Sequence, residues 1–336
     1  ALPDTAAVTA LLGHVDLDTT PIAIDADAHA LPWLQAMLEA ARANGHATGD
    51  LTGAIRTDVA GTLAQTGTLP SSVDACFDDL ADAHRLGETE APWVHLVAAS
   101  SLPIHDAGGD AALSLGFAIA SGLPSVRALV ARGVSIESVV ARTELTVGTH
   151  ADQFLTIASL RAMRLLWAKV LKAHGVSDAQ MFVHAVTGRT TTAVKAPWTN
   201  MLRGANEAAA AAMGSADAIT LTPYDSAIGE PDALAQRIAR NAQLILVREG
   251  HLARVADPAA GSVYVEELTD RLAREAWRHL QRIEAAGGVI SALTSGLIQR
   301  AVAEGVGHRR AALSEGERVL VGVSKYQQVD EPTLTR

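Results

Sequence analysis

The sequence repeats one pattern, in which a short run of apolar, often β-branched residues is followed by a long segment rich in alanine and leucine. Apolar runs of about 4–8 residues bounded by turn residues are typical of buried strands. Seven such runs are found, at residues 21–25, 53–57, 93–98, 141–147, 181–186, 218–222 and 252–256. Their starts lie 32 to 48 residues apart, which leaves room for at least one helix after each strand.

Amphipathic helices are predicted between these strands. The clearest spans Asp152 to His174, where apolar residues recur at helical spacing and Arg161 lies off their stripe. Thr149 is expected to cap its start and Gly175 to end it. Further helices are expected at residues 4–12, 72–85, 231–249 and 268–286.

Strands that are apolar enough to be buried on both faces, each followed by a helix, predict a parallel sheet. We expect an α/β chain that forms a parallel β/α (TIM) barrel. A doubly wound open sheet is the alternative, but no Gly-x-Gly-x-x-Gly follows any strand. Seven strands are one short of a closed barrel. We therefore expect the first strand to precede Ala1, with a return helix capped by Asp4 and ended by Gly13.

The alternating pattern ends near Arg310. Residues 1–310 are predicted to form the barrel. Residues 311–336, with an apolar run at 317–323 and a polar tail that contains Pro332, are predicted to form a C-terminal linker or docking arm. A further domain needs on the order of 100 residues, and the barrel elements leave no room for one.

Charge and cysteine content exclude several classes of protein. The chain has 27 Lys plus Arg against 37 Asp plus Glu, a formal net charge of −10, which argues against a nucleic-acid partner. Cys76 is the single cysteine, so no internal disulfide forms, and the common zinc motifs are missing. We find no signal peptide and no uninterrupted apolar stretch of about 18 residues, so we expect a cytoplasmic protein that does not engage a membrane.

In a β/α barrel, the functional site is built from residues at the carboxyl ends of the strands. Three histidines lie there, His105, His150 and His184, and their near-neutral titration suits general acid or base chemistry. The competing interpretation is that they are ordinary polar residues of barrel loops. We expect no metal site, because these residues lack the spacing of ligands on one helix face, and no Gly-x-Ser-x-Gly supports a serine nucleophile.

Residues Asp82 to Gly87 spell Asp-x-His-x-x-Gly, the pattern in which a histidine coordinates cobalt in base-off cobalamin domains. That motif belongs to a loop after a strand, whereas here it closes the helix predicted at 72–85. A helix end is the favoured interpretation, with His84 and Arg85 near the helix dipole and Gly87 as the stop.

Short motifs from Pro21 to Lys325 together resemble the substrate-binding barrel of methylmalonyl-CoA mutases in order and spacing. The downstream motifs are Asp225-Ser226-Ala227, Arg237 to Gln243, Asp257 to Thr269, Ala276-Trp277 and Gly287-Gly288. The upstream motifs are Asp106-Ala107-Gly108, Gly148 to Phe154, Leu160-Arg161-Ala162 and Leu166 to Lys169. The resemblance implies a barrel that holds acyl-CoA, while a separate domain supplies adenosylcobalamin for the radical rearrangement of methylmalonyl-CoA to succinyl-CoA.

The departures from this family pattern concern its polar substrate contacts. Leu102 and Pro103 stand where catalytic chains carry a Tyr-His pair, and Val186 replaces a glutamine two residues after His184. The family's Gln-Asn-Asp appears as residues 56–58, Arg-Thr-Asp, and its His-Thr-Asn-Ser as residues 220–223, Thr-Leu-Thr-Pro. Each lost buried donor costs on the order of 1–3 kcal/mol. The pattern resembles the small, non-catalytic subunits of the family.

This resemblance implies no catalytic residues in the chain and a vestigial substrate site at Arg56, His184 and Asp225. It implies a heterodimer with a catalytic large subunit, acyl-CoA binding that is weak at most, and adenosylcobalamin supplied by the partner or a missing domain rather than bound directly by this chain. The alternative is an active acyl-CoA mutase barrel of altered substrate range, with Arg56 in place of the lost donors and cobalamin on another chain. An unrelated aldolase or lyase is a third interpretation, but no predicted strand contains or ends in lysine.

Overall fold

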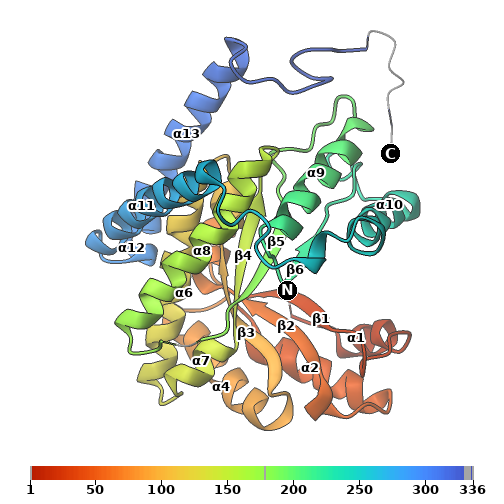
Figure 1. The fold of residues 1–336 in the computed structure, drawn as a ribbon. Coiled ribbons are helices and arrows are strands. Elements are labelled where there is room, and N and C mark those ends of the chain that lie inside the picture. The colour runs from red at the N-terminus through yellow and green to blue at the C-terminus, as the bar shows by residue number, and fades with distance from the viewer. Residues whose placement is uncertain (1, 178, 329–333, 335–336) are drawn as a thin grey trace.

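The computed structural model describes residues 2–177, 179–328 and 334. Within them, six parallel strands form one sheet that curls into a half-barrel (Figure 1). The strands are β1 (Ile22–Asp27), β2 (Thr52–Thr57), β3 (Trp93–Ser100), β4 (Thr143–Thr149), β5 (Phe182–Thr187) and β6 (Ala218–Thr220). They are hydrogen-bonded in chain order, so each strand pairs with the next one in the sequence.

Burial along the strands explains this order. β4, in the interior of the sheet, is buried at all seven positions, whereas the edge strands β1 and β6 are partly exposed. Long apolar runs buried on both faces are what a parallel sheet covered by helices requires. The register of the β1–β2 pair shifts between Asp25 and Asp27, and Asp27 has a positive φ of 53°.

Helices cover the outer side of the sheet (Figure 1). The helices within the described residues are α1 (Thr5–Leu12), α2 (Ala30–Ala43), α3 (Val59–Thr66), α4 (Val73–Glu90), α5 (Leu102–Asp106), α6 (Ala111–Ala131), α7 (Ile136–Ala141), α8 (Gln153–Ala173), α9 (Thr199–Met213), α10 (Ala233–Leu244), α11 (Val263–Ala285), α12 (Val289–Thr294) and α13 (Leu297–Ser314). α11 packs across α6 and α8. Among the described residues, α6 alone has the length and composition to cross a membrane, but 78% of its apolar window is buried, so it is a core helix of this fold.

The helix termini agree with the sequence in part. α1 is capped by Asp4, whose side chain accepts from the amides of Ala6 and Ala7, and it ends at Gly13 as expected. α8 is capped by the side chain of Asp152 rather than by Thr149, because Thr149 still belongs to β4. α10 ends at Leu244 and continues as a π-helical turn to Glu249. α11 begins at Val263, five residues before the predicted start.

The prediction of seven strands within the chain was wrong in one element. The predicted strand at residues 252–256 is a 3₁₀ turn over Leu252–Arg254 in the structure. Positive φ angles at His251 (53°) and Asp257 (44°) bracket this segment and prevent continuous extended backbone. The neighbouring strand β6 is only three residues long, so it offers a short edge for pairing.

The segment predicted as a docking arm begins inside α13, which continues to Ser314. After this helix the chain contacts α9 and the loop before it. Arg203 in α9 donates to the carbonyl of Val321, and Lys195 Nζ donates to Gln327 Oε1 at 2.8 Å. Within the polar tail, residues 324–328 and 334 are described, and the remaining positions, Pro332 among them, lie outside the described residues.

Candidate functional site

A cavity of about 220 Å³ lies against the concave side of the curled sheet. Its lining includes Arg56 from β2, Ser100 from β3, Thr146 from β4, His184 and Val186 from β5 and Thr220 from β6. Loop and helix residues close it, with Asp58 and Gly61 on one side and Leu102 and Pro103 on the other. The structure thus places Arg56 and His184, two residues of the predicted vestigial substrate site, in the lining of one cavity.

Three ionisable side chains are joined inside this half-barrel. Arg56 Nε donates to Glu144 Oε1 at 2.6 Å, and His184 Nδ1 lies 3.1 Å from the same oxygen. On its other side, His184 Nε2 lies 2.8 Å from Thr220 Oγ1. Because β3 separates β2 from β4, the Arg56–Glu144 contact crosses the concave side of the sheet. Arg56, Glu144, His184 and Thr220 therefore form one connected polar cluster on this side of the sheet.

Burial makes this cluster electrostatically strong. The side chains of Glu144 and His184 are 2% and 3% exposed, and that of Arg56 is 16% exposed. Burial alone would raise the pKa of Glu144, but the hydrogen bond with His184 and the charge of Arg56 outweigh it and hold that pKa below its ordinary value. Glu144 is therefore the ionised centre of the cluster, with Arg56 as its counter-ion.

Glu144 was missed by the sequence analysis, although it lies within the predicted strand at 141–147. One signal could have found it. A glutamate inside a strand that is otherwise fully buried has to be paired with a cation, since buried carboxylates are rarely found without a partner. Arg56, on the predicted strand at 53–57, was an available cation.

Asp58 forms the second polar feature of the cavity wall. It caps α3 through a 2.7 Å bond from the amide of Gly61, and its other oxygen accepts from the amide of Ser100 and the hydroxyl of Ser121, each at 3.3 Å. Burial nevertheless raises its pKa to about 6. Asp58 therefore has a structural role in joining β3, α3 and α6, and it is partly protonated in mild acid.

The remaining predicted positions divide between this cavity and other places. Leu102, Pro103 and Val186 line the cavity and give it apolar walls where the family pattern has polar groups. Asp225 does not line it. This residue is fully buried in the loop after β6, where its Oδ2 accepts from the amide of Asp232 at 3.2 Å, close to the start of α10.

His105 and His150 pack together away from this cavity. Their rings meet edge to face with centroids 4.7 Å apart, and Thr190 Oγ1 lies 3.2 Å from His105 Nε2. A Cβ at Gly188 would lie 2.0 Å from His105 Nε2, so the glycine makes room for this ring. Burial, with a smaller effect of Arg309, lowers the pKa of His105 to about 4. The ring is therefore neutral at pH 7 and is fitted into the core.

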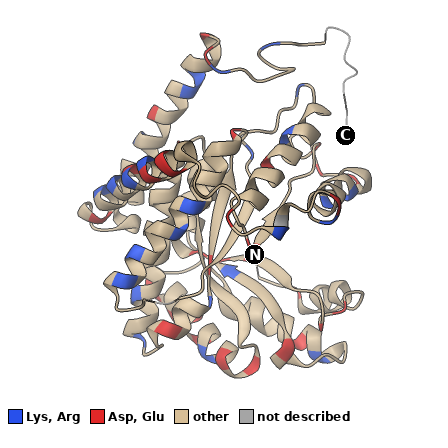
Figure 2. Cartoon of the chain, in the orientation of Figure 1, with Lys and Arg blue, Asp and Glu red and all other residues tan. Residues whose placement is uncertain are grey.

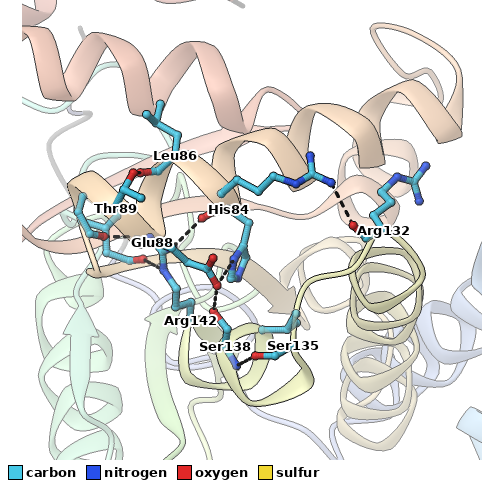
Figure 3. A network of polar contacts seen from close by, with 12 residues as sticks. His84, Leu86, Glu88, Thr89, Arg132, Ser135, Ser138 and Arg142 are labelled. Carbon is cyan, nitrogen blue, oxygen red and sulfur yellow. Dashed lines mark hydrogen bonds and ion pairs between the residues drawn. The ribbon is translucent and has the colours of Figure 1, made fainter.

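The Asp-x-His-x-x-Gly motif is part of a helix rather than a loop (Figure 3). α4 continues to Glu90, so the prediction that Gly87 ends the helix was wrong. Gly87 is needed because a Cβ there would lie 2.3 Å from Arg142 Nη2. Arg142 donates to the carbonyls of His84, Ala91 and Val94 at 2.9–3.1 Å. His84 is fully buried beside it.

Comparison with known proteins identifies the family to which this chain belongs. The family model for methylmalonyl-CoA mutase matches residues 1–335. The chain is 40% identical over 336 residues to the methylmalonyl-CoA mutase small subunit of Streptomyces virginiae, an alignment that covers 100% of this chain and 54% of that protein. The chain belongs to the methylmalonyl-CoA mutase family. It spans about half the length of the relatives it matches.

Both subunit types occur among the relatives of this mutase-family chain. It is 38% identical over 241 residues to a probable methylmalonyl-CoA mutase small subunit of Mycobacterium bovis, covering 68% of this chain and 38% of that protein. It is 28% identical over 327 residues to the methylmalonyl-CoA mutase large subunit of Propionibacterium freudenreichii subsp. shermanii, covering 96% of this chain and 45% of that protein. The identity is thus higher to the two small subunits than to this large subunit.

One of the mutase-family motifs has a structural explanation here. Arg161 of α8 bridges Asp257 at 3.2 Å and Glu266 at 2.7 Å, and Glu266 Oε1 accepts from the amide of Gly261 at 3.1 Å. These contacts fix the loop before α11 onto α8. The motif at 257–269 therefore positions a helix and does not line the cavity.

Proposed function

We propose that this chain is a non-catalytic subunit of a heterodimeric methylmalonyl-CoA mutase. In this proposal it supports the conversion of methylmalonyl-CoA to succinyl-CoA by a catalytic large subunit. Its higher identity to small subunits than to a large subunit favours this assignment. The half-barrel then serves as a scaffold for its partner.

The pairing of Arg56 and His184 with Glu144 is the observation that carries the proposal. A substrate thioester needs hydrogen-bond donors that are free to meet its carbonyl oxygen. Here the Arg56 Nε donor and one nitrogen of His184 face Glu144, and the other nitrogen of His184 faces Thr220. The positions next to them are the apolar Leu102, Pro103 and Val186. A ligand would have to break a buried ionic cluster to gain these contacts.

The size of the cavity supports the same conclusion. Ligand pockets usually have volumes of about 300–1,000 Å³, whereas the cavity on the concave side measures about 220 Å³. A cavity of this size accommodates at most part of a long acyl-pantetheine chain. We therefore propose that acyl-CoA binds this chain weakly at most and that Arg56, His184 and Asp225 are vestigial.

The Asp-x-His-x-x-Gly motif does not fit direct coordination of cobalt, because its His84 is fully buried in α4 and lies close to Arg142. In the proposal, adenosylcobalamin is bound by the large subunit or by a part of the protein beyond this chain. We also propose that the protein acts in the cytoplasm, without contact to nucleic acid or membrane.

Single-turnover kinetics test the proposal. The chain is purified alone and together with a catalytic large subunit, and each sample receives adenosylcobalamin and methylmalonyl-CoA. We expect succinyl-CoA from the complex and none from the chain alone. The double variant Arg56→Met/His184→Leu is expected to lower the stability of the chain, because it leaves the buried Glu144 without its partners, but to leave kcat per assembled complex unchanged within twofold.

Two results would overturn it. Turnover by the isolated chain would make it an active mutase barrel of altered substrate range. A large loss of kcat in the complex that carries the double variant, with association intact by gel filtration, would show that Arg56 or His184 still acts on substrate.

A further inference from the structure

A second cavity, of about 300 Å³, lies where α13 passes over the loop before α6. The two segments are in close contact, since a Cβ at Gly108 would lie 2.7 Å from Val306 Cγ2. The cavity lining includes His150, His308, Arg309 and Arg318 as well as the single carboxylate of Asp110. It is separate from the cavity that holds Arg56 and His184.

The cationic side chains of this second cavity are not neutralised by ion pairs. Neither Arg309 nor Arg318 makes a side-chain hydrogen bond, or an ion pair within 4.0 Å, to any other residue that the structure describes. Burial and the nearby charge of Arg318 lower the pKa of Arg309, while Asp110 only partly compensates. Asp110 is also engaged elsewhere, because its Oδ1 accepts from the amide of Leu113 at 2.7 Å. The cavity lining thus has two guanidinium groups and one carboxylate, and that carboxylate already accepts a hydrogen bond.

His150 provides an independent observation. It is only 7% exposed, it lines the cavity, and its ring makes no hydrogen bond to another described residue. Its one ring contact is with His105. Because the ring lines the cavity and makes no hydrogen bond to a described residue, it is available to a ligand bound there. A bound oxygen in the cavity would accept its N–H.

We propose that this cavity binds a small oxyanion of the phosphate type, either free or as the terminal phosphate of a larger molecule. Arg309 and Arg318 would donate paired N–H groups to its oxygens, the geometry in which guanidinium groups recognise phosphate best. His150 would donate or accept the remaining bond at the floor of the cavity. This proposal does not depend on the function proposed above.

Isothermal titration calorimetry with sodium phosphate and sodium sulfate, at ionic strength held constant with chloride, tests this site. We expect saturable binding of one anion per chain. Arg309→Gln and Arg318→Gln are each expected to weaken it at least tenfold, because each removes a charge-assisted contact. Arg310→Gln is the matched control, an exposed arginine on the same helix that does not line the cavity, and should change the affinity less than twofold.

A third arm uses methyl phosphate. Binding as tight as that of phosphate supports recognition of a phosphomonoester, and binding at least tenfold weaker supports a free anion. His150→Leu, checked for folding by its urea midpoint, should also weaken binding. The proposal is overturned if the folded wild-type chain shows no saturable binding, or if Arg310→Gln weakens binding as much as the two cavity variants.

Discussion

At the residue scale, the ion pair of Arg56 and Glu144 is the central charged feature of the half-barrel interior. Figure 2 shows that most Lys, Arg, Asp and Glu residues lie on the outer helices, with the strands largely free of charge. Arg56 and Glu144 are exceptions, and both belong to the same cluster. A buried ion pair is not by itself a strong source of stability, but removing one partner leaves the other charge uncompensated.

Glu144→Gln should therefore destabilise the fold strongly. The substitution keeps the shape of the side chain and removes its charge, so Arg56 would keep only the exposed Asp25 as a counter-ion, at 3.3 Å. We expect the free energy of unfolding to fall by about 3 kcal/mol, measured by urea denaturation. Glu39→Gln, an exposed glutamate on α2, is the control and should change it by less than about 0.5 kcal/mol. Equal effects of the two variants would show that Glu144 carries no buried charge.

Part of this site could be predicted from the sequence. Arg56, His184, Leu102, Pro103 and Val186 line one cavity because strand ends of a parallel sheet converge, which the spacing of the strands already indicated. To predict the position of Glu144, one would have to know which face of its strand points inward. The strand pattern does not show this, because β4 is buried on both faces. The position of Asp225 depends on the loop after β6, whose path no periodicity describes.

At the scale of elements, α4 is held to the sheet by Arg142. Its guanidinium group satisfies carbonyl groups at the end of α4 and the start of β3 (Figure 3). A Cβ at Gly87 would lie directly against this group. A glycine inside a helix normally costs about 1 kcal/mol relative to alanine. Close packing against a buried arginine reverses that preference here.

Gly87→Ala is expected to destabilise the protein by about 2 kcal/mol, an overpacking cost larger than the gain in helix propensity. Gly307→Ala in α13 is the matched control, because a Cβ there would have nothing within 4 Å. That substitution should stabilise the protein by up to about 1 kcal/mol. Thermal unfolding of both variants checks the prediction, and stabilisation by Gly87→Ala would show that Arg142 does not occupy this space.

The two elements that were predicted incorrectly share a cause. Gly87 was expected to end a helix and residues 252–256 were expected to form a strand, because local patterns favour those structures. The glycine at position 87 is explained by its tertiary contact with Arg142. At residues 252–256, the positive φ angles of His251 and Asp257 interrupt the extended backbone on either side. Neither contact nor backbone strain is visible in the spacing of apolar residues.

At the scale of the whole molecule, buried histidines make the fold sensitive to acid. Burial lowers the pKa of His84 to about 4, with a further effect of Arg142, and that of His105 also to about 4. Between pH 6.5 and 4 the unfolded chain therefore binds protons at these residues that the folded chain does not, so stability is lost as the pH falls through this window. Asp58 acts in the opposite sense, because its raised pKa makes the folded chain bind a proton first as the pH falls from about 6 to 3.8.

Urea midpoints measured at several pH values between 7.5 and 4.5 separate these contributions. The wild-type protein should lose stability below pH 6.5. His84→Gln should reduce the slope by up to about 1.4 kcal/mol per pH unit, the value for one proton, whatever its stability at pH 7.5. Asp58→Asn should instead steepen the loss below pH 6, since it removes the opposing group. If His84→Gln keeps the wild-type slope while Asp58→Asn steepens it, the buried His84 is not what links this fold to acid.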